Sequence, residues 1–395
     1  MATEPGLPPV TRRQCLQRLG LGAGAAWLPA GACSAPRWPT AAVLAACWDD
    51  PKGLHHAGWL RVVSSAAGAA LQVQHATELP TRGHGLAPLP DGRLLVVARR
   101  PGDWLVRLSP TQRPHWVWVE AGRQFSGHVL AGSGTPVFTP EIDTDTGQGL
   151  LSVRHPYNLE KRAEFSTHGL DPHAVLAMPV HGPGGAGRGR AHPLAGMLFV
   201  ANGGIDAAPE TGRTKHHLHR MDSSVVCLHP ATGELLGQWR LPDPRLSLRH
   251  LAWAHTPEGL PVLGIALQAE HDDDATRAAA PLLAVLDWQH NPQGELRLAT
   301  DQPALAGYGG DVALLGQGEG AHFVVSATRG HALAHYTLAA QYRGQTPWAE
   351  AGALSKGHTV WAGGRDGGTR VDGGATPGAV TRFKTGRVDN HWLLA

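Results

Sequence analysis

A short phrase recurs along the chain and limits the folds open to it. It consists of a polar residue followed by three to five small or apolar residues, as in a short buried strand. The polar positions are His84, His128, His173, His250, Asp311, His358 and His391. Successive intervals are 44, 45, 77, 61, 47 and 33 residues. Self-similarity at about 40–50 residues, with strand-rich segments between the copies, predicts a β-propeller whose inner strands carry the phrase.

Composition agrees with an all-β fold, because 51 glycines and 31 prolines suit many short strands joined by turns. Strand-like runs at 41–47, 58–64 and 71–77 lack an inner strand of their own, and the last residues, 390–395, supply one. We therefore predict a seven-bladed β-propeller closed by pairing of its N- and C-terminal strands. The weak pattern after His358 leaves six blades as an alternative.

Residues 1–35 predict a twin-arginine-type signal peptide, with Arg12-Arg13 ahead of a weakly apolar stretch that ends in small residues. The single propeller domain then spans 36–395. We expect a periplasmic, monomeric protein without a transmembrane segment. Lipidation at Cys33 is a minor alternative.

Charge and motifs exclude several classes of function. With 34 basic and 32 acidic residues and no basic tract, nothing indicates a nucleic-acid binder. The sequence has no nucleophile elbow, phosphate loop, dinucleotide fingerprint or haem-attachment motif, and we assign no catalytic residue. Cys47 and Cys227 are expected to be small buried residues rather than ligands.

The 24 histidines are the main chemical signal, since histidine is the commonest protein ligand for metals. The recurring phrase would place its histidines at one height around the channel, as a shared metal site requires. The candidate ligands are His84, His128, His173, His250 and His391, for an ion such as iron or copper. In the alternative interpretation these histidines tie neighbouring blades together through backbone hydrogen bonds.

Further candidates lie beside this ring. Arg82 and Arg249 would orient an anionic ligand or, alternatively, form salt bridges. Glu141, His168 and Asn202 occupy strand ends or loops that would face the same mouth, and Asp311 takes the place of a ring histidine. The histidine cluster 216–219 is expected to be a set of solvated loop histidines, with binding of a divalent ion as the minor alternative, and the acidic run 271–274 is expected to be a solvated turn.

Several of these residues also carry a resemblance to a known family. The distinctive motifs are Arg82-Gly83-His84-Gly85, Ala98-Arg99-Arg100-Pro101-Gly102, Glu164-Phe165-Ser166-Thr167-His168-Gly169, Val200-Ala201-Asn202-Gly203-Gly204-Ile205, Ser247-Leu248-Arg249-His250-Leu251-Ala252 and Asp389-Asn390-His391. In this order they resemble the bacterial DUF1513 family over nearly all of the mature chain. The resemblance implies an exported β-propeller associated with iron acquisition, with imelysin-type or di-haem peroxidase proteins as partners. It implies no reaction and no catalytic residues.

Three functions remain open from the sequence. The first is a periplasmic propeller that binds a metal ion or metal complex at the histidine ring and assists iron acquisition. The second is a metal-dependent oxidoreductase or lactonase-like hydrolase. The third is a protein-interaction scaffold with structural histidines.

Overall fold

The computed structural model describes residues 42–65, 68–132, 135–180, 192–206, 217–356, 359–371 and 380–395. The expected signal peptide, Cys33, His216 and His358 lie outside these residues. The described residues fall within one compact unit, Thr40–Ala395. Among them, no helix combines the length and the apolar character needed to cross a bilayer.

Two four-stranded antiparallel sheets come first after the N-terminal strands, and in each the strands are hydrogen-bonded in chain order. The strands are β4 (Gly83–Pro88), β5 (Leu94–Ala98), β6 (Trp104–Leu108) and β7 (His115–Trp118), then β8 (Arg123–Phe125), β9 (Val137–Asp143), β10 (Gln148–Arg154) and β11 (Lys161–Leu170). A second segment follows β8, bridged to β9 through Leu130 and Phe138. The inner strand that contains His128 is therefore interrupted.

Three more sheets repeat the same antiparallel order. Their strands are β12 (Pro172–Ala177), β13 (Leu198–Asn202), β14 (Ser224–Leu228) and β15 (Leu235–Trp239); β16 (Leu246–His255), β17 (Pro261–Ala269), β18 (Leu283–Asp287) and β19 (Glu295–Leu298); and β20 (Gly309–Leu315), β21 (His322–Ala327), β22 (Ala332–Tyr336) and β23 (Tyr342–Pro347). The acidic run 271–274, expected to be a solvated turn, instead begins a short helix, α2 (Asp274–Ala279). Asp273 caps it by accepting a hydrogen bond from the Thr276 backbone N–H.

The two ends of the described chain share a seven-stranded sheet in the order β24-β25-β26-β3-β2-β1-β27. Its strands are β1 (Val43–Asp49), β2 (His55–Ser65), β3 (Gly68–Leu79), β24 (Val360–Gly364), β25 (Gly367–Val371), β26 (Thr381–Arg382) and β27 (Arg387–Leu394). The C-terminal strand β27 pairs antiparallel with β1, and the short β26 pairs parallel with β3. The seven-blade count stays a prediction, since this one sheet unites both chain ends.

Apolar clusters lie between successive sheets, and they explain why β5, the second strand of its sheet, is apolar throughout. In β5 all five residues are buried. Leu94 and Val96 pack against β1 and β2, whereas Leu95 and Val97 pack against β8 and β9. Alternate residues of one strand thus serve two interfaces, as expected for a strand covered on both faces.

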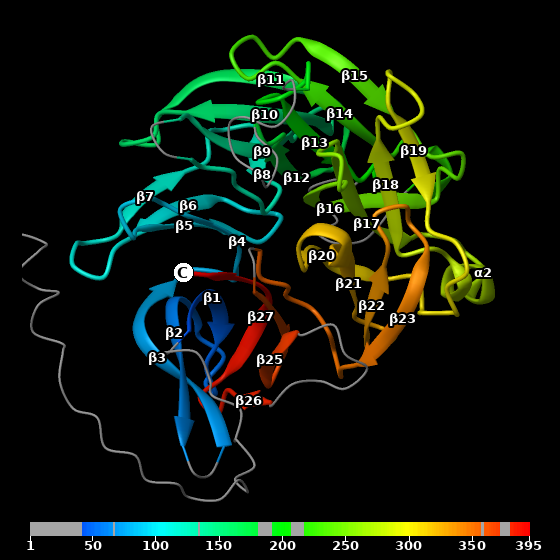
Figure 1. Ribbon diagram of the computed structural model, residues 1–395. Coiled ribbons are helices and arrows are strands. Elements are labelled where there is room, and N and C mark those ends of the chain that lie inside the picture. The colour runs from blue at the N-terminus through cyan, green and yellow to red at the C-terminus, as the bar shows by residue number, and fades with distance from the viewer. Residues whose placement is uncertain are drawn as a thin grey trace, which may run out of the picture. The chain divides into compact units, whose positions relative to one another are not determined.

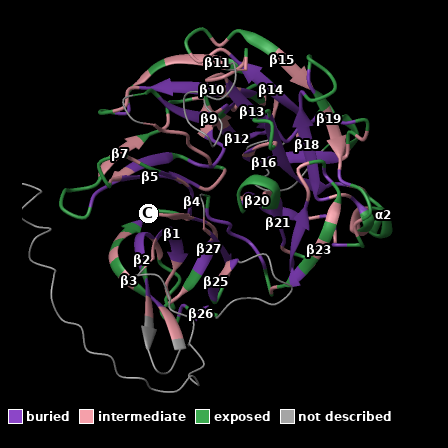
Figure 2. Cartoon of the chain, in the orientation of Figure 1, coloured by how far each residue is buried: buried purple, intermediate pink, exposed green. Residues whose placement is uncertain are grey.

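The same face-to-face packing continues from each sheet to the next, up to the contact of β20–β22 with β24 and β25. Figure 1 shows the sheets following one another around a centre, and Figure 2 shows buried inner strands with more exposed outer ones. This arrangement of four-stranded meanders is a β-propeller. Cys47 and Cys227 are free and buried in these interfaces, as expected.

The strand expected to be the inner strand after His358 is instead the second strand of its blade. The apolar run that follows His358 begins at Val360 and belongs to β24, which is the second strand of its blade. The inner position belongs to residues 352–355, because Leu354 bridges Ala362 and the Ser355 backbone N–H donates to the Trp361 carbonyl. The phrase misleads here because a polar residue before an apolar run describes any strand that is buried on both faces.

Candidate metal centre

The inner strands share a backbone irregularity at the position of the recurring polar residue. In β4, Gly83 pairs with Ala98 and Leu86 pairs with Val96, so His84 and Gly85 together face a single residue of β5. The same kind of register shift occurs in β12, β16 and β20, around His173, His250 and Asp311. Such bulges re-aim side chains. These polar residues therefore leave the pleat of their strands and point to the centre of the propeller.

Five imidazoles meet there, and they come from five different inner segments. His173 Nε2 lies 3.2 Å from His250 Nε2, and His391 Nε2 lies 3.2 Å from His84 Nε2. His128 lies between the pairs, with ring centroids 5.1 Å from His84 and 4.3 Å from His173. The structure thus brings together every histidine that the sequence nominated as a metal ligand.

The nitrogen positions suit a metal ion. Metal–imidazole bonds of about 2.0–2.1 Å place neighbouring ligand nitrogens roughly 3 Å apart. Three overlapping groups each offer one ligand atom per residue within 4.8 Å of one another, namely His84, His128 and His391; His128, His173 and His250; and His250, Asp311 and His391. His128 Nε2 and His173 Nδ1 are buried without a hydrogen-bond partner in the protein. A buried polar atom without a partner is costly, so the donor set fits a bound cation.

Burial keeps four of these histidines, His84, His128, His173 and His250, in the neutral form that binds metals. It lowers the pKa of His84 to about 3, and the neighbouring His391 adds to this effect. Burial also holds the pKa values of His128, His173 and His250 well below the ordinary range, with further lowering of the first two by nearby histidines. Neutral imidazoles therefore persist at moderately acidic pH.

Asp311 completes the ring on the side of His250 and His391. Its Oδ1 lies 3.7 Å from His250 Nδ1 and its Oδ2 lies 3.8 Å from His391 Nδ1. The Lys356 ammonium lies 2.6 Å from Asp311 Oδ1. Burial alone would raise the pKa of this carboxyl, but Lys356 and the two histidines hold it well below its usual value. Asp311 is therefore a carboxylate, able to orient two ring imidazoles or to bind a cation itself.

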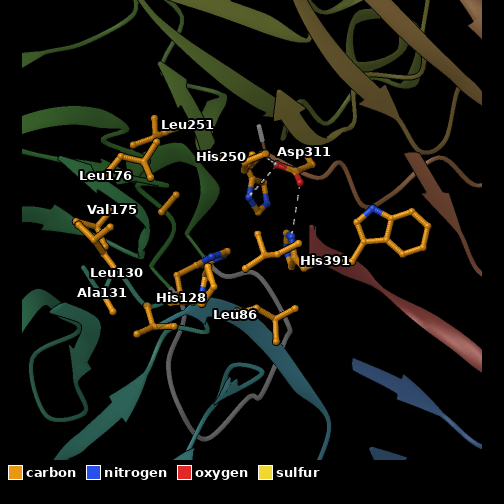
Figure 3. A pocket seen from close by; sticks show the side chains of 18 of the residues that line it. Leu86, His128, Leu130, Ala131, Val175, Leu176, His250, Leu251, Asp311 and His391 are labelled. Carbon is orange, nitrogen blue, oxygen red and sulfur yellow. Dashed lines mark hydrogen bonds and ion pairs between the residues drawn. The ribbon is translucent and has the colours of Figure 1, made fainter. Parts of the chain in front are cut away.

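An apolar cavity of about 280 Å³ opens on one side of the ring. Its lining includes a leucine from each of six inner segments: Leu86, Leu130, Leu176, Leu251, Leu354 and Leu393. His128, His250, His391, Asp311 and Lys356 supply its polar lining. In Figure 3 the His128, His250 and His391 rings face this space, with Asp311 joined to the latter two. A ligand on a ring-bound metal would thus have an apolar surround.

Charged residues occupy the other side, where the inner strands begin. Arg82 forms an ion pair with Asp389 of β27, and Asp389 Oδ2 lies 3.6 Å from His84 Nδ1. Arg249 and Arg100 both contact Asp171, the former at 2.7 Å. Of the two roles expected for Arg82 and Arg249, anion binding or salt bridges, both side chains form salt bridges, with Asp389 and Asp171.

Glu141, His168 and Asn202 are also expected near the channel mouth, and all three lie within strands. Glu141 is buried in β9, where Arg154 and Lys161 bind its carboxylate at 2.9 and 2.8 Å. His168 lies near the end of the outer strand β11, and Asn202 is buried and donates a hydrogen bond to the Thr167 carbonyl. The Glu141 carboxylate and the Asn202 amide thus have partners within the protein, and a ligand-binding role for the three residues stays a prediction.

Two charged residues beside the ring were missed. Asp389 could have been predicted from the sequence, because it stands two residues before His391, just as Arg82 stands two residues before His84. Lys356 could not have been predicted, because it follows an inner segment that lacks the recurring phrase. Only tertiary packing brings it to Asp311.

Comparisons with known proteins add a family and a fold. The sequence profile described as "Protein of unknown function (DUF1513)" matches residues 77–395. No curated protein matches the sequence.

Solved structures share the architecture at low sequence identity. Hydrazine synthase from Kuenenia stuttgartiensis matches with a TM-score of 0.50 and 11% identity, over 80% of this chain and 91% of that chain. A virginiamycin B lyase from Staphylococcus aureus gives 0.48 and 9%, over 82% and 88%. The WD40 repeats of RRP9 give 0.48 and 13%, over 82% and 86%. At these identities the likeness concerns the fold alone.

Proposed function

We propose that this chain, which belongs to the DUF1513 family, binds a transition-metal ion at the ring of His84, His128, His173, His250 and His391. The observation that carries the proposal is the pair of Nε2–Nε2 distances of 3.2 Å, with further buried ring nitrogens left without partners. Two neutral imidazoles can share one proton in such a contact, but His128 Nε2 and His173 Nδ1 are buried with no partner in the protein. A cation satisfies them together.

Imidazoles with one carboxylate suit iron, copper, nickel or zinc rather than calcium or magnesium. We favour iron or copper, and we place the protein in the periplasm as an accessory of iron acquisition. The arginine pair near the N-terminus supports export, and the family resemblance supports the association with iron and with imelysin-type or di-haem peroxidase partners. When bound, the metal would supply Lewis-acid or redox chemistry at the floor of the apolar cavity.

The ring geometry also supports the predicted blade number. We infer that the seven-stranded sheet contains the first and last blades of a seven-bladed propeller, closed by the β1–β27 pair. Inner positions would then be held by His391, His84, His128, His173, His250, Asp311 and the Leu354 segment.

A second candidate function is a metal-dependent oxidoreductase. It is favoured by the cavity of about 280 Å³, which His128, His250 and His391 line together with leucines. Lys356, whose side chain is 41% exposed, supplies the ammonium nearest to the ring carboxylate. It would orient an anionic group or deliver a proton to a molecule in the cavity. The scaffold alternative requires instead that the histidines bind no metal.

The test is the metal content of untagged protein exported by its own signal. We expect about one metal ion per chain in wild type and in His290→Gln, which changes an exposed histidine. The double variant His84→Gln with His250→Gln should fold, because it nearly preserves side-chain volume, and should lose the metal. Equal metal in the folded double variant, or none in wild type after reconstitution with iron and copper, would overturn the proposal.

A further inference from the structure

A second cavity, of about 340 Å³, lies where the inner strands β4 and β27 begin. Arg82, two residues before His84, and Asp389, two residues before His391, line it. Leu86 and Leu393, which follow the same histidines, line the apolar cavity instead. At about 3.3 Å per residue the two cavities lie on opposite sides of the histidine ring. This second cavity, which we term the arginine cavity, is thus distinct from the proposed metal centre.

Its lining carries an excess of positive charge. Arg82, Arg99, Arg329 and Arg365 line the arginine cavity together with only two carboxylates, those of Asp389 and Glu350. The four arginines come from separate segments, namely the start of β4, the end of β5, the β21–β22 turn and the β24–β25 turn. Cations from four segments repel one another unless an anion lies between them. Their convergence on one cavity therefore indicates an anionic ligand.

Packing and ion pairs restrict three of these guanidinium groups. Arg329 lies over the Tyr308 ring, 4.6 Å from its centroid, which favours an extended side chain. Arg82 is bound by the buried Asp389, and Arg365 Nε lies 3.5 Å from Glu350 Oε1. Each of these carboxylates engages one edge of its arginine and leaves other N–H groups of the planar fork for a ligand. Pre-oriented guanidinium groups lose less entropy on binding an anion.

The Asn390 amide adds a neutral contact. Asn390 lines the arginine cavity, and its Oδ1 is buried without a partner in the protein. Because amide oxygen and nitrogen are nearly isosteric, the reverse orientation would present the NH₂ group, a donor suited to an anion's oxygen.

We propose that the arginine cavity binds a small polyanion that carries carboxylate or phosphate groups. Guanidinium forks match both groups through paired N–H···O bonds. The volume lies at the lower end of the range for small-molecule pockets, about 300–1,000 Å³, which excludes large cofactors and suits a compact di- or tricarboxylate or a phosphate. The site needs no metal, so it stands or falls independently of the function proposed above.

Isothermal titration of metal-free full-length protein tests the proposal, with citrate and inorganic phosphate as separate probes at low ionic strength. We expect saturable binding of at least one probe with a stoichiometry near one. The double variant Arg329→Gln with Arg365→Gln changes two exposed side chains and should weaken that binding at least tenfold. The matched control Arg240→Gln, which removes the Arg240–Asp222 surface pair, should bind like wild type.

Each outcome decides the proposal. Tighter binding of citrate identifies a polycarboxylate site, tighter binding of phosphate identifies a phosphate site, and equal binding identifies a general oxyanion site. Absence of binding of either probe at millimolar concentration overturns the proposal. Binding that Arg329→Gln with Arg365→Gln leaves unchanged in a folded protein also overturns it.

Discussion

His173 and His250 stand 77 residues apart in the chain, yet their Nε2 atoms lie 3.2 Å apart at the centre of the propeller. The contact joins the inner strands of two successive sheets, β12 and β16, each with a register shift at its histidine. The long interval arises from extra residues between the strands of the β12–β15 sheet, and this sheet still has the same four-stranded order as the others. The contact thus depends on the shared bulge rather than on even spacing.

Stability of the metal-free protein should fall as the pH decreases from 7 towards 4. The unfolded chain protonates its histidines near pH 6.5, whereas burial keeps the folded-state pKa of His173 far lower. In this window the unfolded state binds more protons, so each such histidine removes up to about 1.4 kcal/mol of stability per pH unit. This destabilisation is absent above about pH 6.5, where both states are neutral, and it grows as the pH falls towards the folded-state pKa.

Denaturant unfolding at several pH values measures this slope. The variant His173→Gln should show a shallower dependence, by up to about 1.4 kcal/mol per pH unit, because one protonation is removed from the unfolded state. His290→Gln, at an exposed position, should retain the wild-type slope. If the slope of His173→Gln equals that of wild type, the histidine is not held neutral by the fold.

Substitutions of Asp311 and Lys356 should change metal affinity in opposite directions. Asp311→Asn removes the carboxylate that faces His250 and His391 and should weaken metal binding about 10–100-fold. Lys356→Gln removes a positive charge that lies 2.6 Å from that carboxylate and should tighten metal binding severalfold. Competition with a chromophoric chelator measures both, and weaker binding in both variants would contradict a role for this pair in tuning the ring.

Much of the fold could be predicted from the sequence because buried strands leave a simple pattern. Runs such as 94–98 and 198–201 are apolar throughout because sheets cover both of their faces. The five ring histidines could be predicted for a related reason, since each stands just before such a run in the chain. The pattern marks the same position on each inner strand. In a propeller, residues at the same position on different inner strands lie at the same height along the axis.

The remainder depends on register and side-chain packing, which the pattern does not record. The bulge at His84 is visible only in the pairing of β4 with β5. The partner of Arg249 is Asp171, a residue with φ of 52° between β11 and β12 that no local motif marks. Lys356 approaches Asp311 from 45 residues away. Charged side chains near the propeller axis can pair with residues of any blade, so the distance between two residues in the sequence does not predict which of them form an ion pair.

Glu141→Gln should lower stability without changing the metal content. The variant leaves the buried Arg154 guanidinium and Lys161 without their shared carboxylate charge, and breaking a buried pair costs about 3–5 kcal/mol. Glu160→Gln, which removes an exposed pair with Arg162, should cost less than about 1 kcal/mol. Denaturant unfolding and elemental analysis of both variants check this. Loss of metal in the folded Glu141→Gln variant would show that Glu141 contributes to the metal centre.

Gly85→Ala should disturb the metal centre although glycine itself binds nothing. A Cβ at this position would lie 2.9 Å from His128 Cα and too close to the Gly127 carbonyl, so the inner strands that carry His84 and His128 must separate. Overpacking of this kind costs about 1–3 kcal/mol, and a shift of a ligand by a fraction of an ångström weakens metal binding. The control Gly320→Ala meets no atom within 4 Å and should leave stability within about 0.5 kcal/mol. Thermal unfolding with chelator competition tests the pair, and unchanged metal affinity in Gly85→Ala would show that the spacing of these two strands does not control the ring.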